Sequence, residues 1–317
     1  MTHRRLVGVD AVWALLFATA AGIVITYSRL PPEELYNVAE GGLASGLGRA
    51  LVFLNYPVSL VAIGIAWLAA GRIATWKARL VALVASALCA VTAAPGVVEQ
   101  EDLDAKVVNV LPAAGVAIAL ALSVRASWRG IGRLALDPVR VGLGLVVAAG
   151  SVAWLFAVLG FFAPGDLYLA EEIRPGGDGR PARAVHLGDH EGLDGALLVT
   201  SALLLSRQLV DVPGRRLRIG VSYYLALMLS YGFAVALKDF WLEQIEKRGW
   251  ASWGMPDVLR PGLTLAWAGL LVTAAVVAIV LLSVEAPRRR AADPQRTAPS
   301  PARGRPSAGS TTDGRSP

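Results

Sequence analysis

The sequence is poor in the residues that usually carry metal or redox chemistry. Its 317 residues include one cysteine, Cys89, and three histidines. A lone cysteine forms no disulfide within the chain, so cysteine usage says nothing about the redox compartment. Charged residues make up 17%, against about 25% in a typical soluble domain, and the mean hydropathy is +0.54. These values exclude an ordinary soluble globular protein.

Long apolar segments recur along the whole chain. We predict eight of them to span a membrane, because each is close to the roughly 17–25 residues that a helix needs. Helices are expected because backbone groups in hydrocarbon must be paired internally, and the segments lack the alternation of barrel strands. The predicted fold is an all-α polytopic transmembrane helix bundle over residues 1–284, with spans at about 9–27, 50–70, 79–95, 107–124, 140–163, 193–210, 217–237 and 262–284.

The basic residues predict the orientation of this bundle. With both termini in the cytoplasm, 20 of the 30 Lys and Arg residues lie on the cytoplasmic side, close to the helix ends that set topology. Eighteen of the 24 Asp and Glu residues then lie on the outer side. The excess of Arg over Lys, 26 to 4, is typical of a GC-rich bacterial genome. We therefore predict a multi-pass protein of the bacterial cytoplasmic membrane, with both termini cytoplasmic.

The arginines at the cytoplasmic rim predict contact with anionic lipid headgroups of the bilayer. Nucleic-acid binding is not expected, because these arginines have neither interleaved aromatic residues nor a binding motif around them. Residues 285–317 are rich in Arg, Pro and Ser and lack apolar periodicity, so we expect a disordered cytoplasmic tail. The sequence indicates no particular protein partner.

Two outer loops contain predicted structure of their own. Between the fifth and sixth spans, LYLAEEIR and ARAVHLG flank the turn-rich PGGDGRP, which predicts a short hairpin. Between the last two spans, residues 239–247 can form an interfacial helix with Trp241, Leu242 and Ile245 on one side and Glu243 away from it.

Polar side chains near the outer ends of the spans suggest a second feature, which we call the polar cup. It comprises Arg29, Asn55, Asn109, Lys238 and Asp239. Polar groups in a bilayer are costly unless they meet one another or water, so a shared outward-facing site is one interpretation. The alternative is that each of them only joins neighbouring helices.

The stretch HLGDHEGLDG, residues 186–195, contains two of the three histidines. If the sixth helix begins at or before His186, then His186, Asp189, His190 and Asp194 share one helical face. If it begins at Asp189 or later, His186 belongs to the preceding loop, and Asp189 or Asp194 becomes a helix cap.

Imidazoles and carboxylates are the ligands that zinc and similar divalent ions take. We therefore predict His186, Asp189, His190 and Asp194 as candidate metal ligands, and His190 with Asp194 as a candidate catalytic pair. Leu187 stands where the zinc-protease motif H-E-x-x-H has its catalytic Glu, so protease chemistry is not implied. Proton-carrying histidines and a solvated loop are the two alternatives.

Three functions follow from these alternatives. The first is a divalent-metal membrane enzyme that acts on an envelope or lipid-linked substrate at the outer face. The second is a transporter or proton-coupled permease, and the third is a non-catalytic scaffold or assembly subunit. The sequence identifies neither the substrate nor a definite cofactor, zinc being one possibility.

Overall fold

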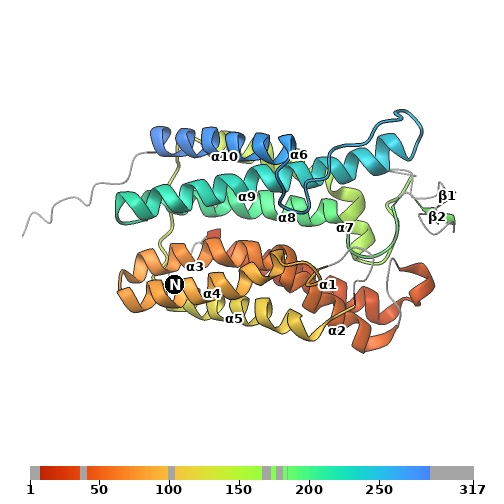
Figure 1. Cartoon of the computed structure of the whole chain (residues 1–317), viewed down its shortest axis with the longest axis horizontal. Coiled ribbons are helices and arrows are strands. Elements are labelled where there is room, and N and C mark those ends of the chain that lie inside the picture. The colour runs from red at the N-terminus through yellow and green to blue at the C-terminus, as the bar shows by residue number, and fades with distance from the viewer. Residues whose placement is uncertain are drawn as a thin grey trace, which may run out of the picture. The chain divides into compact units, whose positions relative to one another are not determined.

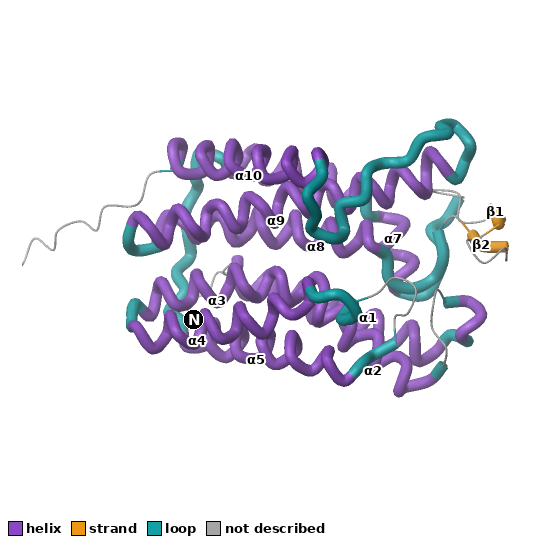
Figure 2. The backbone as a smooth tube through the Cα atoms, in the orientation of Figure 1, coloured by secondary structure: helices purple, strands orange, loops and turns teal. Residues whose placement is uncertain are grey.

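The computed structural model describes residues 8–35, 41–98, 104–165, 173–175, 181–183 and 185–285. Within these residues the chain forms α-helices joined by short turns, with one small two-stranded ribbon (Figures 1 and 2). The predicted disordered tail lies outside the described residues apart from Glu285. The helices are α1 (Gly8–Arg29), α2 (Gly42–Phe53), α3 (Ser59–Ile73), α4 (Trp76–Ala90), α5 (Val110–Arg125), α6 (Asp137–Gly150), α7 (Val152–Val158), α8 (Glu191–Ser206), α9 (Arg215–Trp241) and α10 (Leu265–Val284).

Seven helical segments among the described residues are long and apolar enough to cross a membrane. An eighth results if α6 and α7, which meet at a bend of 57°, count as one span. Short 3₁₀ or π-turns extend several of the segments, which are Gly8–Arg29, Gly42–Ile73, Trp76–Ala93, Val107–Arg125, Glu191–Asp211, Arg215–Glu246 and Leu265–Val284. The chain is thus an all-helical protein with the composition of a membrane protein.

The helices pack in two groups. Helices α3, α4 and α5 contact one another, while α9 packs between α8 and α10 (Figure 1). Helix α1 packs against α2 and α8, and α3 also contacts both α8 and α9, which joins the groups. The buried hydrophobic core is dominated by Val, Leu, Ile and Ala side chains, which let helices pack closely.

The small hairpin predicted in the longest outer loop is present. Strands β1 (Ile173–Pro175) and β2 (Pro181–Arg183) pair in an antiparallel register, with Arg174 opposite Ala182. The turn-rich sequence PGGDGRP that predicted the hairpin spans the residues between the two strands, of which 176–180 lie outside the described residues.

The second span begins earlier than predicted, at Gly42 rather than near residue 50. Its first residues, GLASGLGR, are rich in glycine. Because glycine lowers helix propensity, the sequence does not predict a helix there. Tertiary packing overrides this preference, because a Cβ on Gly46 would meet the side chain of Ser28 and would lie 2.5 Å from the Val24 carbonyl oxygen. This glycine lets α2 lie directly against α1 and draws Arg49 into the bundle.

The fifth predicted span, 140–163, is not one straight helix. It is divided into α6 and α7 at Gly150 and Ser151, and α7 ends at Val158. A Gly-Ser pair is a common cause of a helix kink, because neither residue holds the helical backbone strongly. The bend aims α7 toward the first residues of α8, which it contacts.

The end of the bundle at which α6 begins and α8 ends is closed by ion pairs. Arg140 forms two hydrogen bonds of 2.7 Å with the carboxylate of Glu285, and its Nε donates to Ser206 at 2.9 Å. Asp137 accepts from Arg140 at 3.2 Å and from Arg207 at 3.0 Å. We call this the Arg-rich end. Several rim arginines are therefore paired with carboxylates of the protein itself.

Close backbone contact joins α8 to α9. A Cβ on Gly195 would lie 2.5 Å from the carbonyl oxygen of Gly232 and 2.6 Å from the backbone nitrogen of Ala236. Because these neighbours are backbone atoms, they cannot rotate away from an added methyl group. Glycine is therefore required here by packing.

We predict that Gly195→Ala lowers stability by about 1–3 kcal/mol, the usual cost of overpacking a filled interior. The matched control is Gly269→Ala in α10, where an added Cβ meets nothing within 4 Å. Thermal unfolding in detergent should show a lower midpoint for the first variant and an unchanged or higher one for the second. Equal midpoints for the two variants would contradict this account of the α8–α9 contact.

Candidate functional site

The histidine-containing stretch lies at the beginning of α8, at the opposite end of that helix from Arg207. Helix α8 begins at Glu191, and His190 is the residue before its first turn, with extended backbone angles. The helical-face arrangement of His186, Asp189, His190 and Asp194 is therefore wrong, because residues 185–190 are not helical. The alternative is right in placing His186 in the preceding loop, but its cap is wrong, because His190 and neither Asp189 nor Asp194 is the N-cap of α8.

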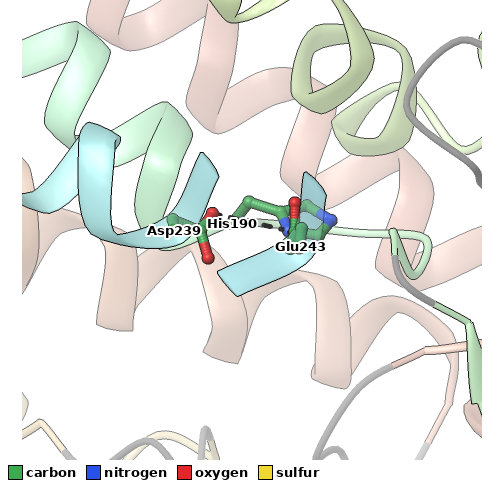
Figure 3. Close-up of side chains that lie close together, drawn as sticks. All are labelled: His190, Asp239 and Glu243. Carbon is green, nitrogen blue, oxygen red and sulfur yellow. Dashed lines mark ion pairs between the residues drawn. The ribbon is translucent and has the colours of Figure 1, made fainter. Parts of the chain in front are cut away.

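Three buried side chains converge at this point: His190, Asp239 from α9, and Glu243 from the turn that follows α9 (Figure 3). The Nδ1 atom of His190 lies 3.1 Å from Oε1 of Glu243 and 4.0 Å from Oδ2 of Asp239. One potential ligand atom from each residue lies within 4.8 Å of the other two. We call these residues the His-Asp-Glu cluster.

Each member of the cluster is held by a further hydrogen bond. Nε2 of His190 lies 2.8 Å from the carbonyl oxygen of His186, and since a carbonyl only accepts, Nε2 carries a proton. The indole Nε1 of Trp154 donates to Oε2 of Glu243 at 2.9 Å. The backbone nitrogen of Gly192 donates to Oδ2 of Asp239 at 2.8 Å. These bonds leave His190 Nδ1 and Glu243 Oε1 facing each other.

Glu243 was missed at the sequence level because it was assigned to the polar side of an interfacial helix. In the structure, α9 continues into a π-turn, Leu242–Glu246, in which the nitrogen of Lys247 bonds the carbonyl of Leu242 at 2.9 Å. The wider turn rotates the chain, so Glu243 is only 2% exposed and Leu242 is 37% exposed. Single π-turns within helices are frequent at functional sites.

The loop before α8 is fixed by a buried ion pair. Nη2 of Arg49 lies 3.0 Å from Oδ2 of Asp189. The backbone nitrogen of Asp189 donates to the hydroxyl of Tyr27 at 3.1 Å, and Oδ1 of Asp189 accepts from the nitrogen of His190 at 3.1 Å. Gly188 has a φ of 108° and lies against the Tyr27 ring, so a side chain at this position is excluded. The loop therefore delivers His190 in one defined position.

The other candidate ligands take separate positions. The ring of His186 stacks on that of His190, with centroids 4.0 Å apart, and its Nδ1 lies 3.1 Å from the Leu187 carbonyl oxygen. Asp189 faces Arg49. Asp194 is buried in the first turn of α8, and its Oδ1 has no hydrogen-bond partner among the described residues. Of the four predicted metal ligands, His190 alone belongs to the cluster found in the described chain.

The residues of the predicted polar cup are also distributed. Asn55 and Asn109 bond each other, with Nδ2 of Asn109 2.9 Å from Oδ1 of Asn55. Arg29 donates to the carbonyl of Gly160 at 3.2 Å. Lys238 lies 3.7 Å from Glu191 and 3.4 Å from Asp257, and Asp239 belongs to the His-Asp-Glu cluster.

The electrostatic surroundings separate the two histidines. Burial lowers the pKa of His190, but the carboxylates of Glu243 and Asp239 and the hydrogen bonds to Glu243 and the His186 carbonyl together outweigh burial and raise it to about 9. Burial lowers the pKa of His186 well below its usual range, and the positive charge of His190 lowers it further. Near neutral pH in the absence of a metal, His190 is therefore the charged member of the stacked pair.

Comparison with known proteins adds no family to this geometry. No protein-family model matches the chain, and no curated protein and no solved structure matches it significantly. The function is therefore argued from the site itself.

The His190–Glu243 pair predicts a pH dependence of stability for the metal-free protein. The folded pKa of about 9 lies above the usual 6.5, so the stabilisation is fully present below pH 6.5 and is lost as the pH rises through about 9. Thermal unfolding midpoints measured with a chelator present should fall across this interval. Glu243→Gln should flatten that part of the profile, whereas an unchanged slope in this variant would assign the titration to another group.

Proposed function

We propose that the protein is a multi-pass membrane protein that binds one divalent metal ion at His190, Asp239 and Glu243. The observation that carries this proposal is the direction of the imidazole. Nε2 of His190 is engaged by the His186 carbonyl, so in the neutral ring Nδ1 offers its lone pair to the space beside both carboxylates. Metal-binding histidines commonly hold their second nitrogen in this way.

The donor set indicates the class of metal. One imidazole nitrogen and two carboxylate oxygens suit zinc, manganese or ferrous iron, whereas thiolates, which select softer metals, play no part here. Three protein ligands leave coordination positions open for water or a substrate, the usual pattern of catalytic rather than structural sites. We therefore favour a metal-dependent enzyme over a structural metal site.

The local balance of charge supports a cation at this end of α8. Five buried or partly buried carboxylates gather there against three lysine or arginine cations, Arg49, Lys238 and Lys247; the carboxylates are Asp189, Glu191, Asp194, Asp239 and Glu243. Uncompensated charge is costly in an apolar interior. A divalent ion beside Asp239 and Glu243 offsets much of this excess.

We propose that the site opens toward the outer face of a bacterial cytoplasmic membrane and acts on an envelope or lipid-linked substrate. The asymmetric distribution of arginine supports this orientation, with both termini in the cytoplasm. In this scheme His190 is a ligand, and Asp194, one turn further along α8, is the acid–base group. A permease would use the same buried charges as a proton carrier, and metal analysis separates the two functions.

The test is the metal content of the purified full chain. After incubation with manganese or zinc and removal of excess ion, we expect about one metal per chain by elemental analysis. Glu243→Gln removes a ligand oxygen and should abolish retention. Glu246→Gln is the matched control, since Glu246 follows in the same turn but lies outside the cluster. Wild type without stoichiometric metal, or both variants behaving alike, would overturn the proposal.

A second variant tests the hydrogen bond that holds the Glu243 carboxylate in place. Trp154→Phe removes the indole N–H that holds Oε2 of Glu243 while retaining an aromatic ring against Gly192. Loss of such a supporting hydrogen bond typically weakens metal affinity about 10–100-fold. Isothermal titration with the metal that wild type retains should show this loss, and an unchanged affinity would mean that Glu243 is not a ligand.

A further inference from the structure

A groove runs along α6 at the Arg-rich end of the bundle, and one part of it lies between α6 and α8. Two adjoining hollows, of about 460 and 350 Å³, share Asp137 and Val141 as wall residues. Both hollows are open to the surroundings of the protein and are depressions of its surface. Leu145 lines the first hollow, and Leu203 and Leu204 from α8 line the second. The groove is therefore apolar along most of its length.

Two glycines make the groove open. Gly142 lines the first hollow and Gly144 the second, and a Cβ placed on either would meet nothing within 4 Å. These glycines thus differ from Gly195, whose missing side chain is replaced by a neighbouring helix. No atom of the described chain fills the space beside Gly142 and Gly144.

Charge is concentrated at one end of the groove. Arg140 and Arg207 are both held by carboxylates, as described above for the Arg-rich end. Arg133, which lines the first hollow, is exposed and makes no ion pair or hydrogen bond with any other described residue. This end of the groove thus has three guanidinium groups and two carboxylates, those of Asp137 and Glu285. One positive charge, that of Arg133, is not balanced by a carboxylate of the described chain.

We propose that this groove binds one anionic phospholipid, with its phosphate at Arg133 and an acyl chain along the α6–α8 hollows. The chemistry matches at both ends, because a guanidinium forms paired hydrogen bonds with phosphate oxygens and the apolar walls suit a hydrocarbon chain. The groove lies between two segments with membrane-spanning composition, so lipid is its natural surrounding medium. A flexible chain can fill an open, uneven hollow that a rigid partner helix would leave partly empty. This inference is independent of the proposed metal site.

The experiment is native mass spectrometry of the full chain, delipidated in detergent and then supplied with phosphatidylglycerol or phosphatidylcholine. We expect wild type to retain one phosphatidylglycerol, with a preference of about five-fold over phosphatidylcholine from one unpaired basic residue. Gly144→Leu places a side chain in the hollow, where its Cβ meets no atom within 4 Å, and should remove the bound lipid. Gly269→Leu is its control, since Gly269 has the same open surroundings in α10 and does not line the groove.

A second pair of variants tests the headgroup. Arg133→Gln should abolish the preference for phosphatidylglycerol, whereas Arg129→Gln, an exposed arginine of the same connection outside the groove, should preserve it. Equal retention of both lipids, insensitive to Gly144→Leu, would show a general lipid shell only and would overturn the proposal. Loss of preference in Arg133→Gln with full retention in Gly144→Leu would place the lipid at the surface and would also overturn the groove site. Gly142→Leu serves as a second filling variant if Gly144→Leu does not fold.

Discussion

A charge buried in an apolar helix bundle must find a partner inside the protein, and this constraint determines how α8 begins. Arg49 is carried into the bundle by α2, where its guanidinium meets Asp189 at 3.0 Å. That contact, together with the hydrogen bond from the Asp189 backbone nitrogen to the Tyr27 hydroxyl, fixes the loop that precedes α8. His190 follows directly, so its ring is directed at Asp239 and Glu243. Removal of one partner alone, either Arg49 or Asp189, would leave the other as an unpaired buried charge, a change that typically costs about 3–5 kcal/mol. The position of the His-Asp-Glu cluster therefore depends on a residue pair outside it.

The two ends of α8 differ in the balance between carboxylates and basic side chains. At the Arg-rich end, Glu285 and Asp137 are matched by Arg140 and Arg207, so the carboxylates there are satisfied by the protein. At the other end carboxylates exceed cations, and Oδ1 of Asp194 has no partner among the described residues. A surplus of buried carboxylate is expected where a bound cation completes the structure. The charge pattern thus agrees with the cation that the ligand geometry indicates, and Asp189, Glu191 and Asp194 add to it carboxylates that lie outside the cluster.

The apolar segments could be predicted because their length and composition report directly on membrane burial. Their exact ends could not, since packing decides them. Gly46 lowers helix propensity, yet it lets α2 approach α1, so the helix begins eight residues before its predicted start at 50. His190 and Asp239 could be singled out as rare polar groups beside apolar segments. Glu243 could not, because a regular helix would direct it away from Trp241, and only the π-turn turns it inward. Arg49 carried a signal that was overlooked, because it is the single charged residue between Glu40 and Arg72.

A proton and a metal ion compete for the same atom, Nδ1 of His190. This competition links the His190–Glu243 ion pair to the proposed metal site. The carboxylate of Glu243 that would help to bind a metal also raises the pKa of His190 to about 9 when no metal is present. At pH 7 a metal must therefore displace a proton, which lowers its apparent affinity about 100-fold below the affinity for the neutral ring. The proton nevertheless has a stabilising role in the metal-free protein. Without either the proton or the metal, two carboxylates would lie side by side in an apolar interior with no positive charge between them. With Nδ1 protonated, one imidazolium charge faces the two carboxylates of the cluster, whereas a divalent ion on the neutral ring would balance both. The proton therefore compensates the cluster in part, and a metal would compensate it more fully.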